Sequence, residues 1–146
     1  MPEVVDVGAV SACASRDALD ALLVPGRATA CRLADDELLL VCDPAVADEV
    51  AREVETRLTV LDPDALVLDV SDGWRGLTIH GDDAGRLFAR LSRLPLPEHG
   101  FVQGEVCHVP AKVLVDDDGI RILVAAALGD HLRSRVGAIA DPEVPA

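Results

Sequence analysis

The stretch from Leu66 to Leu94 constrains the fold of this chain more than any other part of the sequence. Two apolar runs, 66–70 and 74–79, flank Asp72-Gly73. An Asp-Gly pair between two such runs is the strongest short-range signal for a β-hairpin. Apolar residues then recur at the spacing of one buried helical face, at Ala84, Leu87, Phe88, Leu91 and Leu94. The stretch therefore predicts a β-hairpin followed by an amphipathic helix that packs on it.

A similar pattern precedes this stretch. Segment 4–10 is a predicted strand, and Ser15 is a predicted N-cap for a short helix over 16–23. Two further strands, 28–33 and 37–42, flank a tight turn at Asp35-Asp36. Asp43-Pro44 then provides an N-cap acceptor and a proline at the first helical position. The helix that follows carries an apolar stripe of Val46, Val50, Val54 and Leu58.

A third copy of the pattern follows. Strands are predicted over 106–115 and 120–126, around the turn 116–119, and a closing helix begins near Leu128. Its apolar positions are Leu132, Val136 and Ile139. Pro110 lies inside the first strand, so that strand must be an edge, be bulged, or begin only at Ala111.

Together these segments predict an α+β fold, with an antiparallel or mixed sheet built from successive β-hairpin-plus-helix units and helices covering one face. The length of 146 residues fits a single domain over 1–146, or at most a compact pair of half-domains. Its core is expected over about 27–140, with 141–146 as a flexible tail.

Charge and aromatic content restrict the possible partners. A formal net charge of -13 repels phosphate backbones, and the only aromatic residues are Trp74, Phe88 and Phe101. Nucleic acid binding needs basic surface and stacking platforms, so it is not expected. The N-terminus lacks the features of a signal peptide, and no segment approaches the ~18 apolar residues of a membrane helix. We therefore expect an acidic, cytoplasmic protein with no membrane contact and four reduced cysteines.

Three sets of residues could in principle carry chemistry. Cys107-His108 is the only adjacent Cys-His pair, but neighbours on a strand point to opposite faces, so we expect a buried thiol beside an exposed imidazole. A metal site would need Cys31, Cys42, Cys107 and a histidine to converge, and their spacing does not indicate this. Asp116-Asp117-Asp118 could bind a divalent cation, but a solvated loop is the preferred interpretation.

Two other positions have alternative interpretations. His80-Gly81-Asp82-Asp83 leads into the predicted second helix, where the two carboxylates would repel an anion and Gly81 would allow the turn. Trp74 is either a core anchor or a contact for a partner, and we favour the core. No dinucleotide or P-loop motif is present. The sequence thus predicts no catalytic, cofactor-binding or metal-binding residues, and no cofactor.

Four segments carry a resemblance to a known family. They are Leu33–Val41, which reads LADDELLLV, Val67–Gly73, which reads VLDVSDG, Ile79–Ala84, which reads IHGDDA, and Asp118–Val124, which reads DGIRILV. In this order the chain resembles the γ (small) subunit of heterotetrameric sarcosine oxidase. It more distantly resembles the folate-binding fold of the aminomethyltransferase (T-protein) of glycine cleavage. The resemblance covers about 27–140, with Leu38 in place of an expected tryptophan and 104–108 in place of a C-A-Q-T-type segment.

The resemblance implies an accessory role. In that family flavin, nicotinamide and folate binding are attributed to the larger subunits, so no catalytic residues carry over to this chain. The first hypothesis is a non-catalytic small subunit that packs on larger flavin-dependent amine-oxidising subunits, or that self-associates. The second is a stand-alone module that binds a small, folate-like molecule on the concave face of the sheet. The third is an enzyme that depends on Cys107. The first predicts an exposed apolar patch, and the second a closed pocket of at least ~300 Å3.

Overall fold

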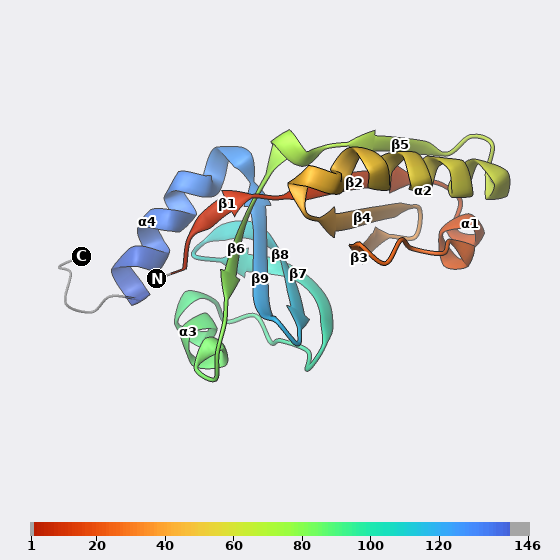
Figure 1. Ribbon diagram of the computed structural model, residues 1–146. Coiled ribbons are helices and arrows are strands. Elements are labelled where there is room, and N and C mark those ends of the chain that lie inside the picture. The colour runs from red at the N-terminus through yellow and green to blue at the C-terminus, as the bar shows by residue number, and fades with distance from the viewer. Residues whose placement is uncertain (1, 141–146) are drawn as a thin grey trace. The chain divides into compact units, whose positions relative to one another are not determined.

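The chain folds into two compact units, each with its own antiparallel sheet and helices (Figure 1). This computed structural model describes residues 2–140. The N-terminal unit is Asp6–Asp72, and the C-terminal unit is formed by 2–5 together with 73–140. The α+β prediction is confirmed, with two sheets rather than one continuous sheet. Folding as a single domain remains a prediction, and the predicted tail 141–146 lies outside the described residues.

The N-terminal unit has a β-α-β-β-α-β arrangement. Its elements are β2 (Gly8–Cys13), α1 (Arg16–Ala21), β3 (Ala28–Ala34), β4 (Glu37–Cys42), α2 (Ala47–Leu61) and β5 (Leu66–Asp69). The sheet order is β3-β4-β2-β5, so the first strand of the unit lies in the interior of the sheet. Both helices contribute to one hydrophobic cluster with this sheet.

Local signals in the N-terminal unit act as the sequence predicts. The hydroxyl of Ser15 accepts a hydrogen bond from the Ala18 amide and caps α1. The Asp43 carboxylate accepts from the Ala45 amide and opens a short 3-10 helix, Pro44–Val46, which leads into α2. The apolar stripe of α2 then faces the sheet, and its residues Val50, Val54 and Leu58 are fully buried.

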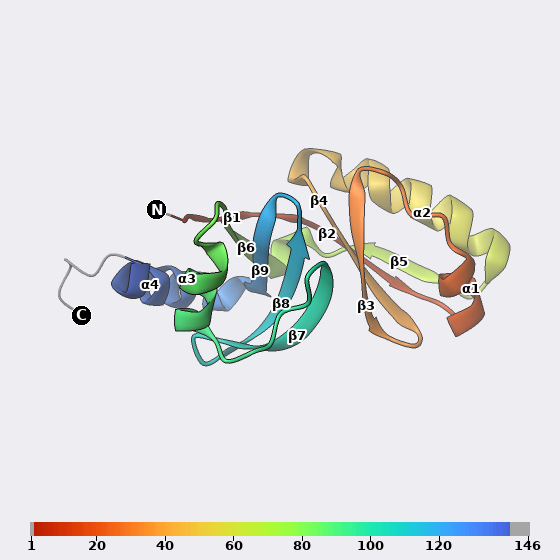
Figure 2. The same ribbon diagram turned by 90° about the horizontal axis from the view of Figure 1, so that it is seen from below.

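The C-terminal unit contains β1 (Val4–Asp6), β6 (Trp74–Ile79), α3 (Ala84–Leu91), β7 (Gly100–Val106), β8 (Val109–Asp116), β9 (Gly119–Ala125) and α4 (Gly129–Ala140). The sheet order is β1-β6-β9-β8-β7. Helices α3 and α4 lie side by side and pack into one hydrophobic cluster with this sheet (Figure 2). None of the helices within residues 2–140 combines the length and the apolar content that a membrane span needs.

The core of the C-terminal unit confirms the predicted apolar face of the second helix as far as Leu91, whereas Leu94 lies beyond the end of α3. Phe88 and Leu91 are buried with Leu77 and Ile79 of β6, and Leu87 is partly buried against the same cluster.

Gly119, with φ of 133°, opens β9 after the turn that joins it to β8. A Cβ at this position would lie 2.3 Å from the carbonyl oxygen of Ile79, so only glycine allows this approach.

The predicted hairpin around Asp72-Gly73 is wrong. β5 pairs with β2 in the sheet of the N-terminal unit, and β6 pairs with β9 in the other sheet. A type I′ turn needs a positive φ at both central residues, and Gly73 does not have one. The segment Ser71–Gly73 instead forms a short 3-10 helix. Ser71 is held to β2, since its hydroxyl accepts a hydrogen bond from the Ala9 amide at 2.9 Å.

The predicted strand over 106–115 is also corrected. It is interrupted by a two-residue turn at Cys107-His108 that joins β7 to β8. Pro110 lies in β8 opposite Glu105, next to the closing pair Val106–Val109. In a two-residue hairpin this position directs its backbone nitrogen away from the partner strand. β8 pairs with β9 only from Lys112 onward, so the missing N–H of Pro110 leaves the ladder intact.

The buried face of α3 gives a direct test of this arrangement. Leu91 is 5% exposed, and Leu91→Ala should lower the free energy of unfolding by about 2–5 kcal/mol because it leaves a cavity in the C-terminal unit. Leu68→Ala is the matched control, since Leu68 is 50% exposed and should lose under about 1 kcal/mol. Chemical denaturation measures both. A loss under about 0.5 kcal/mol for Leu91→Ala would place this face outside the core.

Candidate functional site

The Cys107-His108 turn has an uncommon backbone conformation. Both residues have positive φ, 52° and 67°, although neither is glycine. Such positions usually carry Asn or Gly because a side chain in the left-handed region costs about 1–2 kcal/mol. The amide of Cys107 donates a hydrogen bond to the carbonyl oxygen of Leu91 at 2.8 Å, which ties the turn to the end of α3. The pair therefore lies in a strained turn, whereas the sequence analysis placed it on a strand.

The two side chains of this turn do not form a nucleophile and base. Cys107 is 7% exposed, whereas His108 is exposed, as predicted. Burial raises the pKa of the Cys107 thiol, and the positive charge of Arg135 only partly opposes this shift. A thiol with a raised pKa stays protonated near neutral pH and is a poor nucleophile. The geometry therefore gives no support to the Cys107-dependent enzyme.

The remaining cysteines are dispersed. Cys42 belongs to the helix-facing cluster of the N-terminal unit, whereas Cys31 pairs with Leu39 on the other face of that sheet. Cys13 is exposed. Among residues 2–140, no three His, Cys, Asp or Glu side chains are placed to hold a metal ion. The expected lack of a metal remains a prediction, which can be tested by analysis of the protein.

The acidic turn after β8 is organised by its own hydrogen bonds. Asp116 accepts from the Asp118 amide and from the Arg121 guanidinium, each at 2.9 Å. Asp117 lies 2.8 Å from Nε2 of His99, and this hydrogen bond raises the pKa of His99. Nδ1 of His80 lies 2.7 Å from the carbonyl oxygen of Asp118. These contacts explain the carboxylates as elements of a solvated turn, which is the preferred sequence interpretation.

The segment before α3 forms a turn. Gly81 has φ of 91°, in the region that favours glycine, so it allows the turn as predicted. Asp83 occupies the N-cap position of α3 but makes no side-chain capping hydrogen bond. Its carboxylate lies 4.0 Å from the guanidinium of Arg86. The predicted carboxylates are therefore at the helix N-terminus, where their charge is favourable without a capping bond.

Trp74 is not the core anchor that the sequence favours, since it lies outside the buried cluster. It is half-buried and lines a pocket of about 470 Å3 in the C-terminal unit. The pocket is lined by Trp74, Gln103, Gly104, Glu105, Pro110, Ala111, Lys112, Ala125 and Leu128. Most of its side chains lie on the face of the sheet opposite α3 and α4, because they alternate with the buried residues Leu77, Val113 and Val124. Lys112 donates a hydrogen bond to the side chain of Gln103 on the neighbouring strand. One aromatic ring and one cation thus share this pocket.

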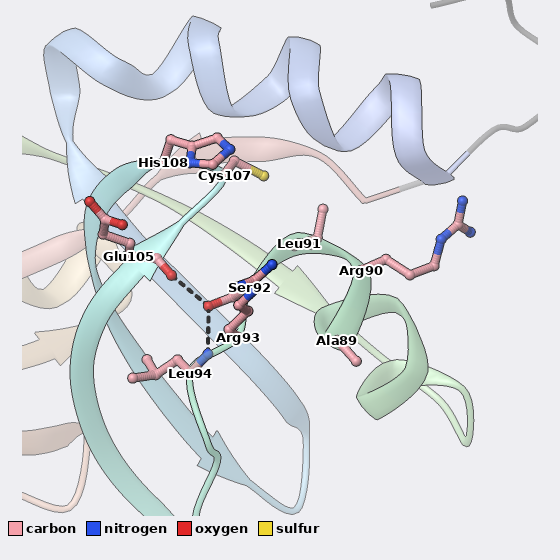
Figure 3. A pocket seen from close by; sticks show the side chains of 9 residues that line it. All are labelled: Ala89, Arg90, Leu91, Ser92, Arg93, Leu94, Glu105, Cys107 and His108. Carbon is pink, nitrogen blue, oxygen red and sulfur yellow. Dashed lines mark hydrogen bonds between the residues drawn. The ribbon is translucent and has the colours of Figure 1, made fainter.

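A larger groove of about 660 Å3 lies between the end of α3 and the Cys107-His108 turn. Figure 3 shows its lining, which is Ala89, Arg90, Leu91, Ser92, Arg93, Leu94, Glu105, Cys107 and His108. The hydroxyl of Ser92 donates to the carbonyl oxygen of Glu105 and accepts from the Leu94 amide at 3.0 Å. These bonds fix the loop after α3 against β7. No sequence motif indicates this groove. Its two walls come from separate segments, 89–94 and 105–108, which are about a dozen residues apart along the chain.

Comparison with known proteins identifies the fold. No protein-family model matches the sequence, and no curated protein sequence is detectably similar. Among solved structures, heterotetrameric sarcosine oxidase from Corynebacterium sp. U-96 matches with a TM-score of 0.73 and 16% identity, over 99% of this chain and 87% of that chain. Glycine cleavage system aminomethyltransferase T from Bartonella henselae matches with a TM-score of 0.64 and 17% identity, over 92% of this chain.

The two matches differ in how much of the other protein they include. This chain spans 45% of the aminomethyltransferase but 87% of the matched sarcosine oxidase chain. The fold resemblance that the sequence indicates is therefore confirmed. At 16–17% identity the likeness concerns the fold alone.

The strain in the β7–β8 turn predicts a stabilising substitution. His108→Gly should raise the free energy of unfolding by about 1 kcal/mol, because glycine adopts the left-handed conformation without a steric cost. His131→Gly is the control, since His131 is exposed on α4 and glycine there should lower stability by about 1 kcal/mol. Urea denaturation measures both variants. Destabilisation by His108→Gly would show that the imidazole makes a contact worth more than the strain.

The thiols give a second test. Purified protein should contain less than one equivalent of zinc by elemental analysis. Cys107→Ser should lower the free energy of unfolding by about 1–3 kcal/mol, because it buries a hydroxyl group, and it should leave any binding unchanged. Tightly held stoichiometric zinc, lost in Cys107→Ser but kept in Cys13→Ser, would restore a metal site at Cys107.

Proposed function

We propose that this chain is a non-catalytic accessory subunit that packs on larger, flavin-dependent amine-oxidising subunits. The observation that carries the proposal is the likeness of nearly the whole chain, 99%, to 87% of one chain in a heterotetrameric sarcosine oxidase. A match of that extent means that the two chains have similar lengths. The likeness therefore extends over most of one chain of an assembly, whereas the match to the aminomethyltransferase includes less than half of that enzyme.

The surface of the N-terminal unit fits such a role. In residues 2–140, seven large apolar side chains are exposed, and six of them lie in this unit: Leu23, Val24, Val60, Leu61, Leu66 and Leu68. Residues 6–72 also hold 15 acidic and 5 basic residues, a net charge of -10. Exposed apolar side chains on a strongly acidic unit favour a protein partner that presents apolar side chains and a basic patch.

A second candidate function is a module that binds a small, folate-like molecule. The specific observation in its favour is the pocket beside Trp74, where an indole ring and the ammonium group of Lys112 could contact a flat, anionic ligand. The fold likeness to an aminomethyltransferase agrees with this candidate. It ranks second because this chain covers less than half of that enzyme.

Titrations of the isolated chain separate the two candidates. We expect no binding at micromolar concentration when FAD, FMN, tetrahydrofolate and duplex DNA are titrated by calorimetry. Micromolar tetrahydrofolate binding that Trp74→Ala abolishes and Trp74→Phe retains would favour the binding module. Micromolar flavin binding would contradict the proposal that flavin chemistry belongs to another subunit.

Purification from the native host tests the accessory role itself. Epitope-tagged protein should elute in a complex of fixed stoichiometry, with flavin absorbance that belongs to a larger chain identified by mass spectrometry. Leu66→Asp combined with Leu68→Asp should weaken the complex, whereas Arg133→Ala, on the C-terminal unit, is the control. Elution as a flavin-free monomer would contradict the proposal.

A further inference from the structure

Positive charge is concentrated in one part of this acidic chain. The C-terminal unit, with its terminal residues included, has 11 acidic and 8 basic residues, a net charge of -3 against -10 for the N-terminal unit. Within it, residues 84–97 contain three arginines and no acidic residue. This segment comprises α3 and the loop that follows it. The loop forms one wall of the 660 Å3 groove.

The arginines of the groove differ from other arginines of the same unit. Arg86 lies 4.0 Å from Asp83, and Arg133 lies 2.7 Å from Asp130, so both have a carboxylate nearby. Arg90 and Arg93 are exposed, and in the described part of the chain neither has a carboxylate within ion-pair distance. Their charges are thus available to a ligand.

The surroundings of these two arginines add to the positive potential. Arg135 of α4 is close enough to act on the thiol of Cys107, on the opposite wall of the groove. The one acidic residue of the lining is Glu105, and Figure 3 shows its carboxylate directed away from Ser92 and Arg93. The two hydrogen bonds of Ser92 hold the backbone on either side of Arg93 in place. A fixed loop reduces the ordering that a ligand must impose.

We propose that this groove binds a small anionic molecule, with its phosphate or carboxylate group held by Arg93 and the charge of the more distant Arg90 adding to the attraction. Guanidinium groups bind such oxyanions through paired, charge-assisted hydrogen bonds. A volume of about 660 Å3 suits a small metabolite rather than a single ion. No Phe, Tyr or Trp side chain lines the groove, so the charged group is the recognised part of the ligand.

The test uses the full chain and simple probes. Orthophosphate, a phosphate monoester (glycerol 3-phosphate) and citrate are titrated at constant ionic strength, with chloride as the reference anion, and binding is followed by NMR shifts of the 89–94 and 105–108 amides. We expect saturable shifts for at least one probe and none for chloride. Arg93→Ala should weaken binding by roughly tenfold or more, since it removes a charge-assisted hydrogen-bonding group. Arg90→Ala should weaken it less, because Figure 3 shows Arg90 extending from the far side of the groove.

Two controls make the outcome decisive. Arg86→Ala and Arg133→Ala remove the same charge from the same unit outside the groove, and each should change affinity less than about twofold. Binding of phosphates alone or of citrate alone would identify the ligand class. Equal weakening by all four variants, equal shifts with chloride, or no shift with any probe would each overturn the proposal. None of these results bears on the accessory role, which does not depend on the groove.

Discussion

The pairing of β5 with β2 is the interaction on which the two-unit arrangement depends. β2 bonds to β4 along one edge and to β5 along the other, and the ladder continues to the bond from the Val70 amide to the carbonyl oxygen of Ala9. Ser71 then satisfies the Ala9 amide with its hydroxyl, while the Asp69 carboxylate accepts from both the amide and the hydroxyl of Ser71. A local hairpin at Asp72-Gly73 would have to give up these bonds. The strand after Gly73 is therefore free to join the other sheet.

Much of the fold could be predicted from the sequence, but strand pairing could not. Periodicity identified α2 and α3, and capping residues identified the start of α1 and of the 3-10 helix that precedes α2, because these signals act within one or two turns of the chain. The Asp72-Gly73 signal failed because β2, some 60 residues away, competes for β5. The opposite error occurred at Cys107-His108. That turn adopts positive φ without Asn or Gly, so no local signal marked it.

The same distinction applies to the candidate sites. The sequence correctly expected a buried thiol at Cys107 beside an exposed imidazole at His108, although it placed both on a strand, and it correctly located the turn over 116–119. The groove beside α3 could not be found in this way. Its walls come from two segments that meet only when β7 packs against the end of α3. The one available signal was a run of arginines without acidic neighbours in a strongly acidic chain.

The placement of β1 means that the N-terminal unit is, in chain order, an insertion into the C-terminal unit. β1 pairs at the edge of the sheet beside β6, yet about 70 residues separate these two strands along the chain. During synthesis β1 leaves the ribosome long before its neighbour exists, so that edge of the sheet can close only after the inserted segment has been made. A fragment that begins at Gly73 would expose the unprotected edge of β6 and invite pairing with other chains. By contrast, the segment 6–72 carries all four strands of its own sheet and takes no strand from the other unit. It is therefore the better segment for separate expression.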